Sequence, residues 1–210
     1  MSLRRNLIIM MKEPRPGRVK TRLARGIGPV EATWWYRHQS ARLVRQVGHD
    51  RRWQTWLAVA PDHALTSRSL PCGAMRIAQG RGDLGARMAR MFAAMPPGPS
   101  VLIGSDIPDI DKSAIDAAFG ALRKHDAVFG PAPDGGYWLI GLSAGVRPGI
   151  GFLQDVQWSS QSALADSKAS LGRYTRLATT QTLQDVDTIA DLACLRRSGF
   201  PNKPYRIGSV

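Results

Sequence analysis

The chain has 210 residues, 43% of them hydrophobic, and a formal net charge of +13. This length and composition allow one substantial core, and no apolar run approaches the ~20 residues of a membrane span. Cys72 and Cys194 lie far apart and outside any paired motif, which excludes a cysteine-pair zinc site and a disulfide scaffold. We therefore expect one domain over residues 1–200, a tail at 201–210 and, because no cleavable signal precedes the first strand, a cytoplasmic location.

The elements predicted in chain order alternate between strands and helices before the pattern changes. They are a strand at 6–11, a helix at 29–48, strands at 55–60 and 75–78, a helix ending at 95, a strand at 100–104, a helix at 111–124, strands at 127–130 and 137–142, a helix near 160–170, a strand near 174–178 and a helix at 188–198. Alternation of this kind predicts an α/β fold, a doubly wound and mainly parallel sheet with helices on both faces. The run at 137–142 follows its predecessor too closely for a crossover helix, so we expect it to pair antiparallel in a mixed sheet.

The positive charge is concentrated near the start of the chain. Residues 1–53 hold thirteen lysines and arginines against three acids, which favours an anionic partner. Nucleic acid is not the expected partner, because no helix-turn-helix, zinc-finger or aromatic RNA-binding signature is present. In the helix at 29–48, we expect Trp34, Leu43 and Val47 to face inward.

A loop rich in cations follows the first strand, with Arg15, Arg18, Lys20 and Arg22 around a Pro/Gly-broken turn. A strand, a cationic loop and a helix in succession are typical of α/β proteins that hold phosphorylated ligands at the carboxyl edge of the sheet. Lys20 and Arg22 would suit the charge that develops on a departing pyrophosphate or nucleoside diphosphate. The alternative is a solvated basic loop. A Walker ATPase is not expected, since the first glycine of that motif is replaced by Lys12.

Acidic residues follow the central strand and recur near the end of the chain. Asp106 comes directly after the strand at 100–104, where a carboxylate could hold Mg²⁺ or Mn²⁺ or could cap the turn before Pro108. Asp185 and Asp187 would lie on one face of an extended segment and could bind the same metal. Alternatively, Asp187 or its neighbour Thr188 caps the last helix.

Two glycine-containing turns are candidate binding segments. The turn at 79–85 precedes a helix and could bring backbone amides to a nucleotide, although Asp83 could simply cap that helix. The turn at 131–138 places paired glycines beside an acid and two aromatic residues, which suits a ligand lying against backbone and ring. Its alternative interpretation is a tight turn held by core aromatic side chains.

Five motifs carry a family resemblance: K-x-P-x-P-G-x-V-K-T-R-L at 12–23, Q-G-x-G-D-L-G-x-R-M at 79–88, G-S-D-x-P at 104–108, G-P-A-x-D-G-G-Y-x-L-I-G-L at 130–142 and D-V-D-T-x-x-D-L at 185–192. In this order they resemble the DUF2064 group of the nucleotide-diphospho-sugar transferase superfamily, which has the GT-A fold. The resemblance implies a GT-A/Rossmann-like domain, a nucleoside triphosphate or nucleotide-sugar, a small-molecule acceptor and a divalent metal, Mg²⁺ or Mn²⁺. Glycosyltransferases of this fold usually carry a D-x-D motif, and here Asp109 stands one residue too late for it.

The resemblance and the residues together assign four groups of site residues. The catalytic group is Lys20, Arg22 and Asp106; the nucleotide-binding group is Gly17, Arg18, Lys20, Gln79, Gly80, Gly82, Asp83, Leu84 and Gly85; the acceptor-binding group is Asp134, Gly135, Gly136 and Tyr137; and the metal ligands are Asp106, Asp187 and Asp185. The expected function is nucleotidyl transfer to a phosphorylated or hydroxyl acceptor. Glycosyl transfer and a non-catalytic nucleotide-binding module are the alternatives.

Overall fold

The computed structural model describes residues 3–146, 148–172 and 175–197. Within them, seven strands form one sheet in the order β3-β2-β1-β4-β6-β5-β7. The strands are β1 (Arg5–Lys12), β2 (Trp53–Ala60), β3 (Met75–Ala78), β4 (Ser100–Gly104), β5 (Ala127–Pro131), β6 (Tyr137–Leu142) and β7 (Leu177–Thr179). Strand β6 is antiparallel to β4 and β5, and the other pairs are parallel. The predicted mixed, mainly parallel sheet is therefore confirmed.

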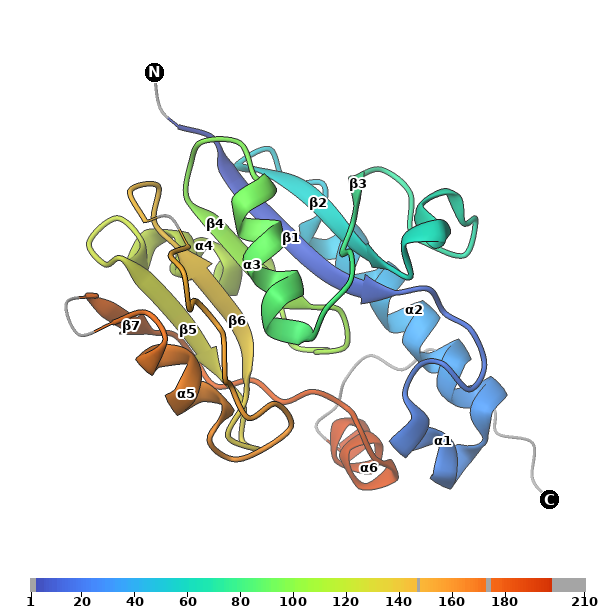
Figure 1. The fold of residues 1–210 in the computed structure, drawn as a ribbon. Coiled ribbons are helices and arrows are strands. Elements are labelled where there is room, and N and C mark those ends of the chain that lie inside the picture. Colours follow the sequence, from blue (N-terminus) through green and yellow to red (C-terminus); the bar gives the residue numbers. More distant parts are fainter. Residues whose placement is uncertain (1–2, 147, 173–174, 198–210) are drawn as a thin grey trace.

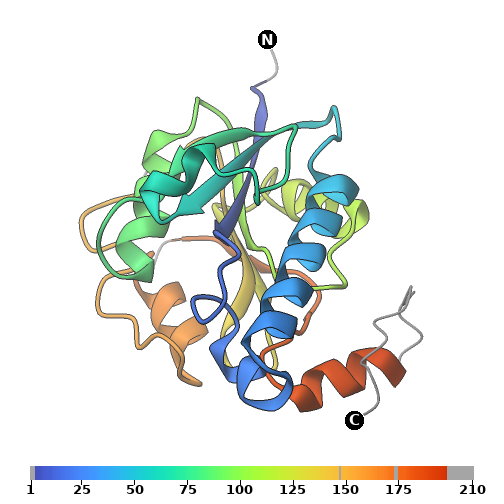
Figure 2. The ribbon, with the colours of Figure 1, turned by 90° about the vertical axis from the view of Figure 1, so that its right-hand side faces the viewer.

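Helices cover both faces of the sheet (Figures 1 and 2). They are α1 (Thr21–Ile27), α2 (Pro29–Val47), α3 (Leu84–Ala94), α4 (Lys112–Ala121), α5 (Ala163–Ala169) and α6 (Ile189–Arg197), with a short 3₁₀ turn at Asp62–Thr66. Helices α2 and α4 pack on one face, and α3 and α5 on the other. None of the helices in the described part of the chain combines the length and the apolar character of a transmembrane segment.

The alternation of β1 explains the two-layered core. Leu7 and Ile9 join the hydrophobic cluster under α2 and α4, whereas Ile8 joins the cluster under α3. All three side chains are fully buried, as expected for a central strand whose successive side chains point to opposite faces. The sheet is therefore packed on both faces, and the ends of its central strands can position loops at one edge.

The inward face of α2 differs from the prediction at one residue. Leu43 and Val47 are buried as expected, but Trp34 is 48% exposed and stacks on His38 with ring centroids 3.4 Å apart. Helical spacing counted back from the buried positions reaches Tyr36 rather than Trp34. The tail at 201–210 and the predicted end of the last helix at 198 lie outside the described residues.

Helix α4 begins at a side-chain cap. The carboxylate of Asp111 accepts a hydrogen bond of 2.8 Å from the backbone N–H of Ala114. This bond holds the pKa of Asp111 below its ordinary value of 3.8. The cap therefore links helix stability to pH.

Replacing Asp111 with alanine should lower the free energy of unfolding by about 1 kcal/mol at neutral pH. Because the folded-state pKa is lowered, this stabilisation is present above the unfolded value of 3.8 and is lost as the pH falls through the folded-state pKa. Urea denaturation at successively lower pH measures the loss. Asp109→Ala, which removes an exposed carboxylate two residues earlier, is the control. An equal loss at every pH would contradict the expectation.

Candidate active site

Lys20 lies at the centre of a cluster of carboxylates. Its backbone adopts a left-handed conformation (φ 47°, ψ 47°) immediately before α1, and its side chain is only 4% exposed. The ammonium nitrogen Nζ lies 2.7 Å from Oδ2 of Asp106, 2.6 Å from Oδ1 of Asp187 and 3.9 Å from Oδ2 of Asp185. Arg22 reaches the same cluster, with Nη1 3.3 Å from Oδ2 of Asp187. Residues more than 160 positions apart in the sequence thus meet at one point.

Strand pairing brings Asp106 beside the basic loop. Strand β4 runs parallel to β1, and Gly104 pairs with Met10, so both strands deliver their following residues to the same edge of the sheet. Asp106 and Lys20 are each carried to this edge by the loop that leaves a central strand. The carboxyl ends of parallel strands are the usual position for ligands in such sheets.

The two late aspartates reach the site from an extended segment that runs below the sheet between β7 and α6 (Figure 1). Val186 is buried in a hydrophobic cluster with Leu23 of α1 and Leu192 of α6. Because successive side chains in an extended segment point to opposite sides, Asp185 and Asp187 face the other way, toward Lys20. Thr188 and Asp191 exchange hydrogen bonds at the start of α6, so this capping function does not occupy Asp187.

The cluster is electrostatically unusual. Burial lowers the pKa of Lys20, but the charges of Asp106 and Asp187 outweigh it and raise the pKa above its ordinary value, so the ammonium stays protonated. Burial raises the pKa of Asp185 to about 7, with repulsion from Asp187 and Asp106 added and the charge of Lys20 opposing. When all three carboxylates are ionised, their charge exceeds that of Lys20 and Arg22 together by one negative unit. Such a site favours additional cations.

The donor set fits a divalent metal ion. One oxygen from each of Asp106, Asp185 and Asp187 can be chosen so that all three lie within 4.8 Å of one another. Carboxylate oxygens at such separations are the ligands that Mg²⁺ and Mn²⁺ prefer. In this structure the ammonium of Lys20 supplies the counter-charge.

A cavity of about 450 Å³, here called the basic cavity, opens on one side of the cluster. Four cations line it: Lys12, Lys20, Arg22 and Arg87. Gln79 also lines it and is held firmly, because its amide donates to the carbonyl of Ala58 at 2.7 Å and to that of Met11 at 3.1 Å. This lining suits a polyphosphate.

A second cavity of about 520 Å³, here called the aromatic cavity, also borders the carboxylate cluster. Three aromatic residues and one acid are among the residues that line it: Tyr137, Trp138, Trp158 and Asp134. The residues that line both cavities are Met10, Arg22, Leu84, Gly104, Asp106 and Asp187. The two cavities therefore meet at the carboxylate cluster.

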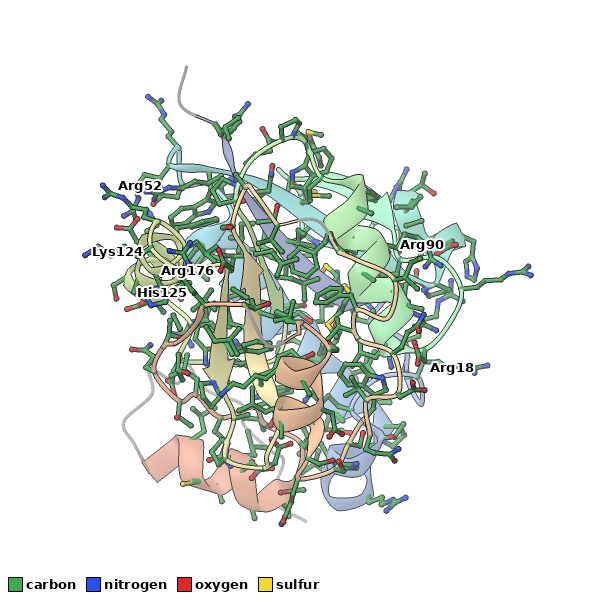
Figure 3. All side chains as sticks on the ribbon, turned by 60° about the vertical axis from the view of Figure 1, so that its left-hand side comes forward. Arg18, Arg52, Arg90, Lys124, His125 and Arg176 are labelled. Carbon is green, nitrogen blue, oxygen red and sulfur yellow. The ribbon has the colours of Figure 1, made fainter. Side chains whose placement is uncertain are left out.

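The predicted nucleotide-binding residues fall into different environments. Gln79 and Leu84 line the basic cavity. Asp83 caps α3 through the N–H of Ala86 at 2.8 Å, so the capping alternative describes its contact here. Gly17, Gly80 and Gly82 bend their loops with positive φ. Arg18 is exposed, extends away from the protein (Figure 3) and lines neither cavity.

Two glycines are required by close packing. A side chain at Gly85 would overlap the carbonyl oxygen of Leu153, and one at Gly135 would overlap the backbone of Gln161. Gly135 also has a φ of +87°, which disfavours other residues. The loop at 153–161, which precedes α5, therefore lies in close contact with the start of α3 and with the turn before β6. The two turns thereby build the walls of the aromatic cavity.

Sequence reasoning missed Tyr36 and the loop at 153–161. The Tyr36 hydroxyl accepts a hydrogen bond of 2.9 Å from the N–H of Lys12 and lies 2.9 Å from Oγ of Ser105. Burial raises the pKa of Tyr36 to about 12, so it remains neutral and joins the ends of β1 and β4. Its helical position predicts burial, but not these partners. The loop carries no motif that would single out Trp158.

The fold, a mixed and mainly parallel sheet with helices on both faces, is GT-A-like and is similar to that of a nucleotide-sugar transferase-like protein of solved structure. The chain belongs to the DUF2064 family, described as an uncharacterized protein conserved in bacteria, whose model matches residues 43–160. That stretch contains Asp106 but neither the basic loop nor the two late aspartates. No protein with a curated description matches the sequence.

Three solved structures illustrate the likeness. A proposed nucleotide-diphospho-sugar transferase from Desulfovibrio desulfuricans G20 is 28% identical, with a TM-score of 0.81 over 100% of this chain and 92% of that chain. CMP:2-keto-3-deoxy-manno-octonic acid synthetase, complexed with CTP, is 13% identical, with a TM-score of 0.53 over 93% of this chain and 98% of that one. Glucosyl-3-phosphoglycerate synthase from Mycobacterium tuberculosis is 12% identical, with a TM-score of 0.54 over 96% of this chain and 82% of that one. Its structure holds Mn²⁺, UDP and glucosyl-3-phosphoglycerate. The last two are likenesses of fold alone.

Proposed function

We propose that the protein is a metal-dependent nucleotidyltransferase, which joins a nucleotide to a small phosphorylated or hydroxyl acceptor and releases pyrophosphate. The observation that carries this proposal is the convergence of Lys20 and Arg22 on three carboxylates between a basic and an aromatic cavity. The CTP-bound synthetase of the same fold supports a nucleotide substrate. The basic cavity would take the triphosphate and the aromatic cavity the acceptor.

The chain's own residues would act by charge and position. Asp106, Asp185 and Asp187 would hold Mg²⁺ or Mn²⁺, whose charge would offset that of the triphosphate oxygens. Lys20 and Arg22 would stabilise the departing pyrophosphate, because fixed cations in a water-poor site need no reorganisation. The acceptor oxygen forms a bond to the α-phosphorus as the bond to the bridging oxygen breaks. Pyrophosphate leaves with the electron pair, and an acceptor proton passes to solvent.

Turnover and nucleotide binding should both depend on a divalent cation. We expect a chelator to abolish pyrophosphate release from a panel of nucleoside triphosphates and acceptors, and added Mn²⁺ or Mg²⁺ to restore it. Calorimetry should show nucleotide affinity at least about tenfold higher with the metal, because each ligand reduces the charge that the other meets. Nucleotide affinity and turnover that are unchanged by the chelator would refute the metal dependence.

Glycosyl transfer from a nucleotide-sugar is the second candidate, favoured by the likeness in fold to the UDP- and Mn²⁺-bound synthase. The leaving group separates the two reactions, because nucleotidyl transfer releases pyrophosphate and glycosyl transfer releases a nucleoside diphosphate. A third possibility is a nucleotide-binding module without turnover. That module would bind nucleotide with metal and release neither product.

A further inference from the structure

The two cavities that meet at the carboxylate cluster differ in charge. The basic cavity is lined by four cations and by the carboxylates of Asp106 and Asp187. Among the described side chains that line the aromatic cavity, Arg22 is the one lysine or arginine, and the carboxylates are Asp106, Asp134, Asp185 and Asp187. Of these carboxylates, Asp134 is the one outside the carboxylate cluster, and no lysine or arginine among the described residues forms an ion pair with it.

Arg22 is poorly placed to hold a second phosphate in the aromatic cavity. It lines both cavities, and its guanidinium already lies 3.3 Å from Asp187. Asp134 stands at the turn before β6, where its Oδ1 accepts a hydrogen bond of 2.9 Å from the N–H of Gly136. Its charge reaches the cluster, since it contributes to raising the pKa of Asp185. A phosphate monoester would meet this carboxylate without a cation of its own.

The walls suit a ligand with a flat apolar face and hydroxyl groups. Tyr137 and Trp158 meet edge to face with centroids 6.4 Å apart. Trp138 is fixed by a hydrogen bond of 3.0 Å from its Nε1 to the carbonyl of Gln181. The indole N–H of Trp158 is buried without a hydrogen-bond partner among the described residues, and Gln161 adds an amide to the lining. Apolar walls with a few polar groups give a pocket both affinity and orientation.

We propose that the acceptor is an uncharged polyhydroxyl compound, a sugar or polyol, and that the aromatic cavity disfavours phosphorylated compounds. The inference rests on the proposed function in one respect, because it needs the nucleotide to occupy the basic cavity. It narrows that function by selecting the hydroxyl acceptor over the phosphorylated one. Rings pack against the apolar face of the ligand, and Asp134 accepts hydrogen bonds from its hydroxyl groups.

The test compares matched pairs of acceptors on the full chain with Mn²⁺ and the preferred nucleotide. The pairs are glycerol with glycerol 3-phosphate, glucose with glucose 6-phosphate, and inositol with inositol 1-phosphate. We expect the neutral member to be used at least about tenfold faster in every pair that reacts, a ratio typical of an unfavourable charge placed in a binding site. Faster use of phosphorylated members, or a panel in which no neutral member reacts, would overturn the proposal.

Variants at Asp134 tie the preference to this carboxylate. Asp134→Asn keeps an oxygen for the N–H of Gly136 and should lower the ratio of the rate with the neutral acceptor to the rate with the phosphorylated acceptor by about threefold. Asp134→Lys should lower this ratio by about tenfold or more. The control is Asp116→Asn, which removes a carboxylate beside Arg5 at the opposite edge of the sheet and should leave the ratio unchanged. A ratio unchanged in a folded Asp134→Asn variant would overturn the assignment.

The released nucleotide product keeps the two proposals separate. A preference for neutral acceptors with a nucleoside diphosphate as the product would refute nucleotidyl transfer and leave the acceptor class intact. Pyrophosphate release with phosphorylated acceptors would support nucleotidyl transfer and refute the neutral acceptor class.

Discussion

A Lys20→Met variant should bind Mn²⁺ about tenfold or more tightly than the parent in the absence of nucleotide, yet turn over about 100-fold or more slowly. The reason is that the ammonium lies 2.6 Å from Asp187 and 2.7 Å from Asp106, where it neutralises the oxygens that a metal would need. Without it the carboxylates repel one another and gain from any added cation. The same substitution removes a charge that stabilises the departing pyrophosphate.

Three measurements check these opposite effects. Calorimetry gives the Mn²⁺ affinity, turnover gives the rate, and the melting temperature should rise more with Mn²⁺ in the variant than in the parent, because a ligand stabilises the folded state by its affinity. Arg18→Met is the matched control, since it removes an exposed cation from the same loop that lines neither cavity. If the Lys20→Met variant bound Mn²⁺ no more tightly than the parent does, Lys20 would not be competing with the metal for the carboxylate oxygens.

An Asp106→Ala variant should lose about 100-fold or more in turnover together with most of the metal-dependent part of its nucleotide affinity. Asp106 lines both cavities, touches Lys20 and belongs to the carboxylate cluster, so its removal affects metal binding and positioning at once. Rates from saturating metal and nucleotide separate the two effects, because a pure loss of metal affinity would be restored at high Mn²⁺.

The neighbouring carboxylate supplies the comparison for Asp106. Asp109 is exposed and lines neither cavity, so Asp109→Ala should keep nearly full activity. An Asp106→Ala protein that folds and retains the parental rate would remove Asp106 from the site. A protein that binds nucleotide with metal but never turns over, in parent and variant alike, would indicate a binding module.

The sequence predicts the site better than its surroundings. The buried runs at β1 and β4 point to a shared edge, and this edge does bring Lys20 and Asp106 together. Period-two spacing likewise places Asp185 and Asp187 on one side, opposite the buried Val186. These features follow from local rules of strand geometry, so they can be read from short stretches of sequence.

Features that depend on tertiary packing could not be predicted in this way. The antiparallel pairing of β6 is indicated by its short connection, but its insertion between β4 and β5 is not. The approach of the loop at 153–161 to Gly85 and Gly135 depends on which backbones meet, and no local pattern encodes it. The exposure of Trp34 has a different origin, because helical spacing from Leu43 and Val47 reaches Tyr36 and therefore already places Trp34 off the buried face.

The late position of Asp185 and Asp187 has a consequence for biosynthesis. A nascent chain stopped near residue 180 would already contain β1 to β7 and both cavity-forming turns, yet it would lack two of the three clustered acids and the segment that carries them. Its Lys20 would keep one carboxylate partner, Asp106. The proposed metal-assisted reaction would therefore become possible only after residues 185–187 have been synthesised.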